Sequence, residues 1–271
     1  MKKKLPLFSL GFLALIILCC IFASALAPYS PETMDSSAVN LAPCREHFFG
    51  TDNMGRDLFT LVLYGGRASL IIGLASAVIS TFIAVVYGTA SGLASERTDD
   101  LLMRIAELAM SLPSILVILF LQAVWGEATY LSLSLIIGVT SWMNIAKIVR
   151  SEVRQIGESD YILAARTMGG GFWYILRQHL LPNYVPAIMF MVVSNISAAI
   201  ITESTLSYLG LGLPLTEVSW GSLLTMSQEA LLSNYWWMIV IPGAVLIATL
   251  VCITNLGEYI RKTNTRLFSN L

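Results

Sequence analysis

Long runs of apolar residues dominate the chain, at 5–27, 68–94, 105–124, 129–148, 184–209 and 236–260. Each run is long enough to cross a bilayer as a helix, which needs about 20 residues. The runs are continuously apolar instead of alternating with polar residues, so they indicate helices and not the strands of a barrel. The pattern therefore predicts an all-α, polytopic membrane protein with six transmembrane helices.

Composition and charge agree with this prediction and add an orientation. Of the 271 residues, 56% are hydrophobic and 12% are charged, which is too apolar for an ordinary soluble domain. All but three of the 16 Lys and Arg residues lie at the chain ends or in alternate connections between the runs; the exceptions are Arg45, Arg56 and Arg67. Because cytoplasmic loops are rich in Lys and Arg, we expect both termini and the connection 157–182 to be cytoplasmic. The net charge of −1 gives no indication of a nucleic-acid partner.

The connection 157–182 is polar, broken by glycines and rich in helix-forming residues. Ser159 or Asp160 is predicted to cap a first helix with its side chain, and Gly169 to end that helix in a left-handed turn. A second short helix is expected over 172–181, with Pro182 at the start of the fifth span. The small side chains of this segment would let another surface approach closely. An amphipathic helix at the membrane interface, with no partner, is the alternative.

The first external segment, residues 28–66, changes character towards its end. It is mostly rich in Pro, Ser, Asp and Asn, which predicts loop structure. Near its end, glycines alternate with Asp52, Arg56 and Asp57, and apolar residues then follow at helical spacing. This pattern predicts a capped interfacial helix leading into the second span, or a folded element lining the external mouth. The two interpretations are compatible.

Glu203 is an ionisable residue inside the fifth apolar run, where a charge is costly and is a functional candidate by default. Three interpretations stay open. Glu203 could face the translocation path, it could pair with Arg67 or Arg56, or it could pack with hydrogen bonds from Thr202, Ser204 or a neighbouring helix. The candidate residues for a path or an external mouth are therefore Asp52, Arg56, Asp57, Arg67 and Glu203.

Proline, aromatic and small residues give finer expectations. Pro113 and Pro242 are predicted to kink the third and sixth spans, because proline removes a helical donor. Small residues such as Gly73 favour close packing of helices in lipid. Aromatic residues expected to anchor the chain at the membrane interface are Trp220, Tyr235, Trp236 and Trp237.

Motifs for catalysis, phosphate binding and metal binding are absent from the sequence. It has no Gly-x-x-x-x-Gly-Lys phosphate loop, so the chain is not itself an ATPase. Its two histidines, His47 and His179, are predicted on opposite sides of the membrane and cannot form a metal pair. We therefore expect no catalytic residue, no metal ligand and no cofactor bound by this chain.

Three separated blocks of the sequence stand in a recognisable order. They are Gly50-Thr51-Asp52 to Gly55-Arg56-Asp57 with Tyr64-Gly65-Gly66-Arg67-Ala68-Ser69-Leu70; Asp160-Tyr161, Ala164-Ala165-Arg166 and Gly169 with Leu181-Pro182-Asn183; and Leu206-Ser207-Tyr208-Leu209-Gly210-Leu211-Gly212 with Trp220-Gly221. Together they resemble the peptide/nickel branch of the bacterial ABC-importer permeases. The resemblance covers roughly residues 49–257. One departure is Leu163, where that family often has a glutamate that contacts the ATPase.

The resemblance implies a membrane-spanning subunit of an ATP-driven importer in the bacterial inner membrane. Its partners would be a homologous second permease, two ABC ATPase subunits that carry ATP and Mg, an extracytoplasmic substrate-binding protein and membrane lipid. The chain would comprise a first helix and external loop (1–66), a five-helix permease core (67–260) containing the coupling hairpin 157–182, and a cytoplasmic tail (261–271). Residues implied in coupling to the ATPase are Asp160, Ala164, Ala165, Arg166, Gly169 and Pro182.

A different class of function is a self-contained channel or ion-coupled carrier. Such a protein would have several ionisable residues inside its spans. The spans hold essentially Glu107, near one end of the third, and Glu203. We therefore favour the importer permease, with small peptides or nickel and other metal chelates as the substrate classes that the resemblance implies.

Overall fold

The computed structural model describes residues 6–214, 216–226, 230 and 233–268. Within these ranges it is helical and has no strand, only one isolated bridge between Thr51 and Asp57. The predicted all-α fold is confirmed. The helices are α1 (Leu7–Ile21), α2 (Ala23–Leu26), α3 (Leu58–Leu93), α4 (Glu96–Ser111), α5 (Ser114–Trp125), α6 (Tyr130–Thr140), α7 (Met143–Gly157), α8 (Asp160–Thr167), α9 (Phe172–Ile175), the π-helical segment η1 (Leu176–Leu180), α10 (Leu181–Tyr208), α11 (Trp220–Met226) and α13 (Trp237–Phe268).

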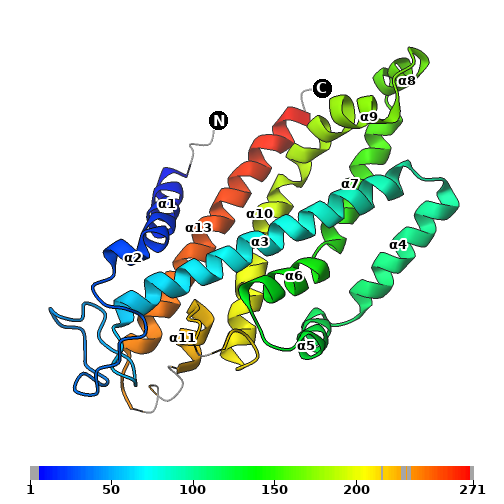
Figure 1. The fold of residues 1–271 in the computed structure, drawn as a ribbon. Helices are drawn as coiled ribbons and strands as arrows, with labels where there is room; N and C mark the ends of the chain where they lie inside the picture. Colours follow the sequence, from blue (N-terminus) through cyan, green and yellow to red (C-terminus); the bar gives the residue numbers. More distant parts are fainter. Residues whose placement is uncertain (1–5, 215, 227–229, 231–232, 269–271) are drawn as a thin grey trace.

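Helix α3 is the long element around which the others are arranged (Figure 1). It packs against α6, α7 and α10, and α10 in turn packs against α13. A Cβ atom on Gly73 would lie 2.5 Å from Ile200, and one on Gly88 would lie 2.6 Å from the Ala146 carbonyl oxygen. Both distances are shorter than ordinary contact, so α3 needs glycine where it crosses α10 and α7. The predicted use of small residues at helix crossings is confirmed at Gly73.

The apolar runs form helices of very different lengths. Among the described residues, three helical stretches are long and apolar enough to cross a membrane: Leu58–Leu93, Phe172–Tyr208 and Trp237–Thr263. Two bent helix pairs, α4 with α5 and α6 with α7, raise this number to five if each pair is one span. Helix α1 has only 15 residues, and residue 5, the first of the predicted run 5–27, lies outside the described residues.

The third and fourth predicted spans are broken helices, which corrects the expectation of a kink in the third. The axes of α4 and α5 differ by 86°, and those of α6 and α7 by 48°. The first break falls at Leu112, which has an extended backbone conformation, and at Pro113, whose ψ of 117° is not helical. Because proline lacks an N–H group and disfavours helical geometry in the preceding residue, it ends the helix here instead of bending it. By contrast, α13 runs without a break through Pro242.

The start of the second predicted span also differs from the structure. The sequence places the span at 68–94 after a separate interfacial helix, whereas α3 is one helix of 36 residues from Leu58. Asp57 caps it, its carboxylate accepting a hydrogen bond of 2.8 Å from the Thr60 backbone N–H. The predicted cap is present, but the helix that it begins is the span itself.

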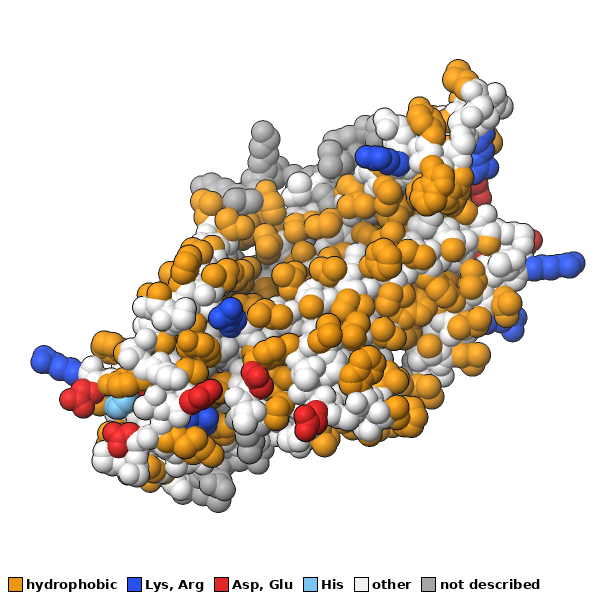
Figure 2. Space-filling model, viewed as in Figure 1, with side chains coloured by type: hydrophobic (Ala, Val, Ile, Leu, Met, Phe, Trp, Pro, Cys, Tyr) orange, Lys and Arg blue, Asp and Glu red, His pale blue; other side chains and the backbone are white. Residues whose placement is uncertain are grey.

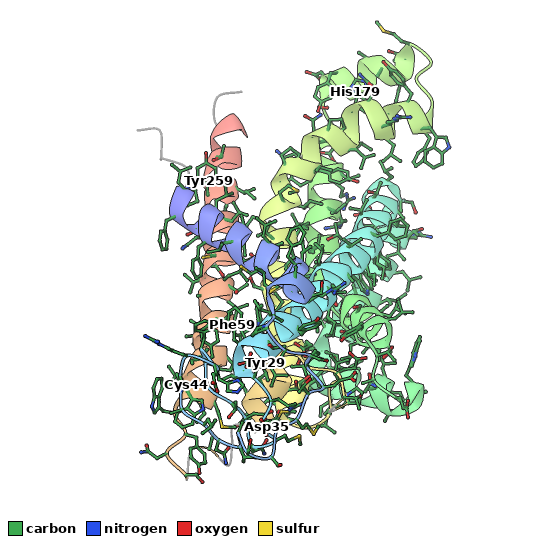
Figure 3. All side chains as sticks on the ribbon, turned by 60° about the vertical axis from the view of Figure 1, so that its left-hand side comes forward. Tyr29, Asp35, Cys44, Phe59, His179 and Tyr259 are labelled. Atoms are coloured by element: carbon green, nitrogen blue, oxygen red, sulfur yellow. The ribbon has the colours of Figure 1, made fainter. Side chains whose placement is uncertain are left out.

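The molecule has two ends with different character. The α8–α9 hairpin, the start of α1 and the end of α13 lie at one end, here called the hairpin end (Figure 1). The loop 27–57 and α11 lie at the opposite end, here called the loop end. Figure 3 places His179 and Tyr259 at the hairpin end, and Tyr29, Asp35 and Cys44 at the loop end. In Figure 2, hydrophobic side chains cover most of the face between the ends, where charged side chains are sparse.

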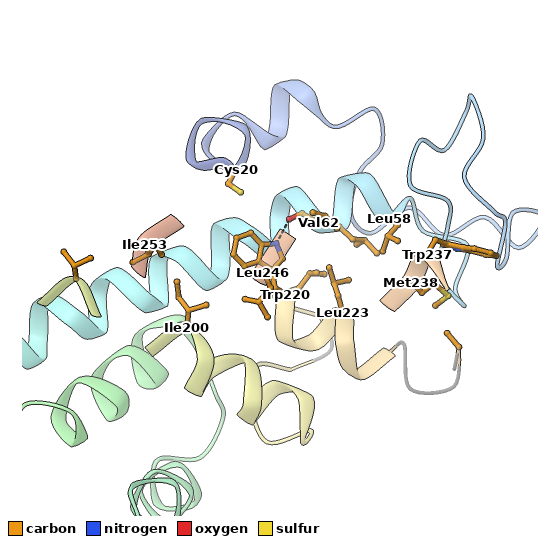
Figure 4. Packing of buried hydrophobic residues seen from close by; sticks show 14 residues of the cluster. Cys20, Leu58, Val62, Ile200, Trp220, Leu223, Trp237, Met238, Leu246 and Ile253 are labelled. Atoms are coloured by element: carbon orange, nitrogen blue, oxygen red, sulfur yellow. Dashed lines mark hydrogen bonds between the residues drawn. The ribbon is translucent and has the colours of Figure 1, made fainter. Parts of the chain in front are cut away.

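Two of the tryptophans predicted as interfacial anchors are buried in the core at the loop end. Trp220, on α11, has no exposed surface, and Trp237 is 6% exposed. The Trp220 Nε1–H donates to the Val62 carbonyl at 3.0 Å (Figure 4), and the Trp237 Nε1–H donates to the Thr51 carbonyl at 3.2 Å. Each indole therefore satisfies its polar group inside the protein and not at a membrane surface. Trp236, which is 54% exposed, remains free to act as an anchor.

Candidate functional site

The hairpin formed by α8 and α9 projects from the hairpin end and is fastened by buried apolar residues at its base. Ile162 of α8 and Ile175 of α9 pack in one cluster with Val153 and Ile156 of α7 and Tyr184 of α10. The four helices α7, α8, α9 and α10 thus share one core at the root of the hairpin, which also includes Ala84 of α3 and Leu180 of η1. A displacement of α8 would be passed directly to α7 and α10, because a close-packed core resists deformation.

Helix α8 begins at Asp160, one residue before the predicted start near Tyr161, and Ser159 at its cap position lacks the predicted side-chain cap. Ser159 occupies the cap position in an extended conformation, and its side chain accepts no bond from the first turn. Its hydroxyl donates to the Ile156 carbonyl of the preceding helix at 2.5 Å. The close succession of α7 and α8 explains this, since the Ile156 carbonyl at the end of α7 lies next to Ser159 and also accepts its backbone N–H at 3.0 Å.

Helix α8 ends in the predicted left-handed glycine. Gly169 has a φ of +86°, and the N–H groups of Gly170 and Gly169 donate to the carbonyls of Ala165 and Arg166 at 2.9 and 3.0 Å. This pair of bonds is the Schellman motif, which satisfies the last carbonyls of a helix. The Gly169 conformation is one that L-residues adopt only at a cost.

The second half of the hairpin is not a separate helix, which corrects the sequence prediction for 172–181. Helix α9, η1 and α10 form one continuous stretch from Phe172 to Tyr208, and Pro182 lies within its path. The helix accommodates proline by a shift of register, in which the Leu181 N–H bonds to the Leu176 carbonyl five residues back. The Asn183 side chain donates to the His179 carbonyl at 2.6 Å. The fifth predicted span and the second half of the hairpin therefore form one continuous helical segment.

The outer surface of the hairpin is apolar and exposed. Met168 is 87% exposed, Trp173 is 76% exposed and Leu163 is 51% exposed. The implied coupling residues Asp160, Ala164, Arg166 and Pro182 are also exposed, and Ala165 is partly buried. Ala164 and Ala165 have short side chains, so a partner surface could come close to the backbone on this side of α8.

At the loop end, the charged residues that the sequence singles out form two buried pairs. The Arg56 guanidinium contacts the Asp52 carboxylate at 2.8 Å, and His47 Nδ1 lies 2.9 Å from Asp57. All four residues are buried. Both pairs lie within the loop 27–57, and Asp57, which caps α3, links one of them to the start of that helix. His47 lies ten residues from Asp57, and no sequence pattern marked it as a partner.

Arg67 and Glu203 do not form the ion pair that the sequence leaves open. Arg67 is exposed, whereas Glu203 has no exposed surface. The Glu203 carboxylate accepts hydrogen bonds from Ser69 on α3 at 3.0 Å and from Ser207 on α10 at 2.8 Å. Ser69 also accepts the Trp220 backbone N–H at 3.2 Å. Glu203 thus links α3, α10 and α11 through serines, and among the described residues no ion pair joins it to Arg67 or Arg56.

An ion cluster that the sequence pattern does not predict lies near the hairpin end. Asp99, at the start of α4, has no exposed surface and accepts bonds from the Ser91 hydroxyl of α3 at 2.5 Å and from Arg154 of α7 at 2.9 Å. It also accepts two bonds of 2.9 and 3.1 Å from the Arg150 Nε–H. The spacing of the two arginines, four residues apart on one helix, was the available signal. The cluster joins three helices close to the root of the hairpin.

Comparisons with known proteins agree on one family. The family model described as binding-protein-dependent transport system inner membrane component matches residues 84–263. A second model, described as the N-terminal TM domain of oligopeptide transport permease C, matches residues 1–43.

Several bacterial permeases are similar to nearly the whole chain. The dipeptide transport system permease protein DppC of Bacillus subtilis is 35% identical over 95% of this chain and 80% of its own length. The oligopeptide permease OppC of the same organism is 35% identical over 96% of this chain and 85% of its own length. The probable D,D-dipeptide permease DdpC of Escherichia coli is 31% identical over 96% and 86% of the two chains.

The fold has a counterpart among solved structures. A chain in the crystal structure of an amino acid ABC transporter with histidines superposes with a TM-score of 0.54, covering 76% of this chain and 94% of that one at 14% identity. That identity is low, so the likeness concerns the fold alone. Together with the matched family model and the relatives, the helical architecture shows that this chain belongs to the family of binding-protein-dependent transport system inner membrane components, the permeases of ABC importers.

Proposed function

We propose that the chain forms half of the translocation path of an ATP-driven peptide importer and couples to its ATPase subunits through the hairpin 157–182. The observation that carries this proposal is the exposed apolar surface of the hairpin, which ends in the Schellman turn at Gly169. Exposed apolar patches of this kind mark sites of interaction with proteins or membranes. The buried core at the hairpin base then connects the docking surface to α7 and α10.

In this proposal the hairpin end is cytoplasmic and the loop end faces outward from the inner membrane. The concentration of Lys and Arg at the hairpin end supports this orientation. Both termini then lie in the cytoplasm, since α1 begins and α13 ends on that side (Figure 1).

The partners follow from the family. They are a second permease that completes the path, two ATPase subunits that bind ATP and Mg, and an external substrate-binding protein. Residues 67–260 would form the permease core, with 1–66 and 261–271 as additions at its two ends. The coupling residues would be Asp160, Ala164, Ala165, Arg166, Gly169 and Pro182.

Peptide is the substrate class that we favour over nickel or other metal chelates. Two relatives that are 35% identical to this chain are named as dipeptide and oligopeptide permeases. A decisive experiment reconstitutes the complete transporter, with its own binding protein, in proteoliposomes. ATP-dependent uptake of a labelled dipeptide, without uptake of ⁶³Ni²⁺, is expected. Nickel uptake in the absence of any peptide uptake would overturn the choice of substrate, and uptake that does not need ATP would support a carrier instead.

A further inference from the structure

A pocket at the loop end is a candidate binding site separate from the hairpin. It has a volume of about 630 Å³ and lies between the loop 27–57, the first turns of α3, the start of α6 and the segment before α11. Small-molecule sites usually have volumes of roughly 300–1,000 Å³. The pocket is therefore large enough for a substrate of a few residues.

The pocket carries both signs of charge. The exposed guanidinium of Arg67 lies on its α3 wall, and the exposed carboxylates of Glu32 and Glu217 lie on the loops around it. Arg56 also reaches the wall, but its guanidinium is already paired with Asp52. Across the described part of the chain, no ion pair within 4.0 Å joins Arg67 to a carboxylate. Cation and anions therefore share one cavity without neutralising each other.

One of the carboxylates is held in place. The Tyr130 hydroxyl, at the start of α6, donates a hydrogen bond to the Glu217 carboxylate. This bond ties the segment before α11 to α6 and fixes one wall of the pocket. Tyr64 and Ile71, on the same side of α3 as Arg67, supply apolar surface between the charged groups.

We propose that this pocket binds the two charged ends of a short zwitterionic peptide before it enters the path. Arg67 would receive the α-carboxylate, because a guanidinium can donate two parallel hydrogen bonds to it. Glu217 and Glu32 would receive the terminal ammonium group. This inference rests on the proposed function, since it takes peptide as the substrate class.

A lipid is the competing ligand, because Arg67 also borders a second cavity. That cavity is apolar, with a volume of about 470 Å³, and is lined by residues of α1, α3, α10 and α13. An acyl chain would suit it, with an anionic headgroup at Arg67. The two carboxylates in the first pocket disfavour an anionic headgroup and favour a ligand that carries a positive charge as well.

The test is photo-crosslinking on the complete transporter in nanodiscs with its binding protein. The probe is a dipeptide with a diazirine side chain, used with a free C-terminus and as the C-terminal amide. In the wild type, mass spectrometry should find the free-acid probe attached to the pocket segments around Tyr64 and Tyr130. Arg67→Gln should lower this labelling about tenfold or more, because a charge-assisted contact is lost. Arg67→Lys should retain part of the labelling. The amide probe should label the wild type and Arg67→Gln equally weakly.

Arg45→Gln is the matched control, since Arg45 is exposed on the loop 27–57, which borders the pocket, but does not itself line the pocket. It should label as the wild type does. Equal labelling in Arg67→Gln and wild type would overturn the inference. The inference would also be overturned if Arg67→Gln abolished photo-labelling by a diazirine-bearing phosphatidylglycerol but left labelling by the dipeptide probe unchanged. If the wild type imports dipeptides but the pocket stays unlabelled, this inference fails alone, whereas absence of any dipeptide import defeats the proposed function.

Discussion

At the scale of single residues, Gly169 is where local conformation bears most directly on the proposed coupling. Its φ is +86°, and apart from its two chain neighbours no atom lies within 4 Å of the position that a Cβ would take. A side chain there meets no steric obstacle, so any penalty comes from the backbone. Gly169→Val should strain the turn by roughly 1–2 kcal/mol and shift the tip of α8. We expect the complex to assemble normally while ATP-dependent uptake falls severalfold.

Gly171→Val is the control for this prediction. Gly171 also has open space around its Cβ position, but its φ is −71°, which valine adopts readily. Uptake and substrate-stimulated ATPase activity should be measured for both variants in proteoliposomes. If Gly169→Val matches Gly171→Val, the turn at the tip plays no part in coupling.

Sequence reasoning at this scale succeeds where the cause lies within a few residues. The Asp57 cap and the Gly169 turn depend on atoms no more than four or five positions away, and the structure contains both. The partners of Glu203 could not be chosen from the sequence, because Ser69 lies 134 residues away. Trp220 was misplaced for the same reason, since its acceptor at Val62 comes from another helix.

At the scale of helices, the Asp99 cluster is predicted to hold α4 against α7. Replacing Asp99 by Asn removes the charge that two arginines share and leaves weaker hydrogen bonds. Hydrogen bonds to charged groups contribute roughly 1.5–3 kcal/mol, and the partial exposure of both arginines places the loss towards the lower end. We expect Asp99→Asn to lower the thermal unfolding midpoint of the purified complex by a few degrees.

The neighbouring Asp100 provides a matched control, because it is exposed on the same turn. Asp100→Asn should leave the unfolding midpoint within error of the wild type. A midpoint for Asp99→Asn that equals that of Asp100→Asn would show that the cluster does not stabilise the junction of α3, α4 and α7.

The apolar pattern predicted where the helices are better than where they break. A run of apolar residues looks the same whether it forms one straight span or two helices at 86°. The prolines indicated where a helix could be interrupted, but not whether it breaks there or continues. Pro113 separates two helices, whereas Pro182 is absorbed by a π-helical segment and Pro242 by α13.

At the scale of the whole molecule, the orientation of the two ends is testable with a native cysteine. Cys44 is exposed on the loop 27–57, whereas Cys20 and Cys252 are buried and Cys19 is partly buried. In intact cells, a membrane-impermeant maleimide should label the wild type at Cys44, and Cys44→Ser should abolish most of the labelling.

The opposite end is probed in that same background. With Cys44→Ser present, a cysteine at Gly170 should react only after the membrane is permeabilised. Labelling of Gly170→Cys in intact cells would place the hairpin outside and would be incompatible with coupling to a cytoplasmic ATPase.

The most direct test of the central claim is a crosslink from the tip of the hairpin. A photoreactive amino acid at Met168, which is 87% exposed, should form a covalent product with an ATPase subunit in membranes that contain the whole transporter. The same residue at Phe48, which is 65% exposed at the loop end, should give no product with the ATPase. Products between Met168 and lipid alone, or between Phe48 and the ATPase, would contradict the proposal that the hairpin 157–182 couples this permease to ATP hydrolysis.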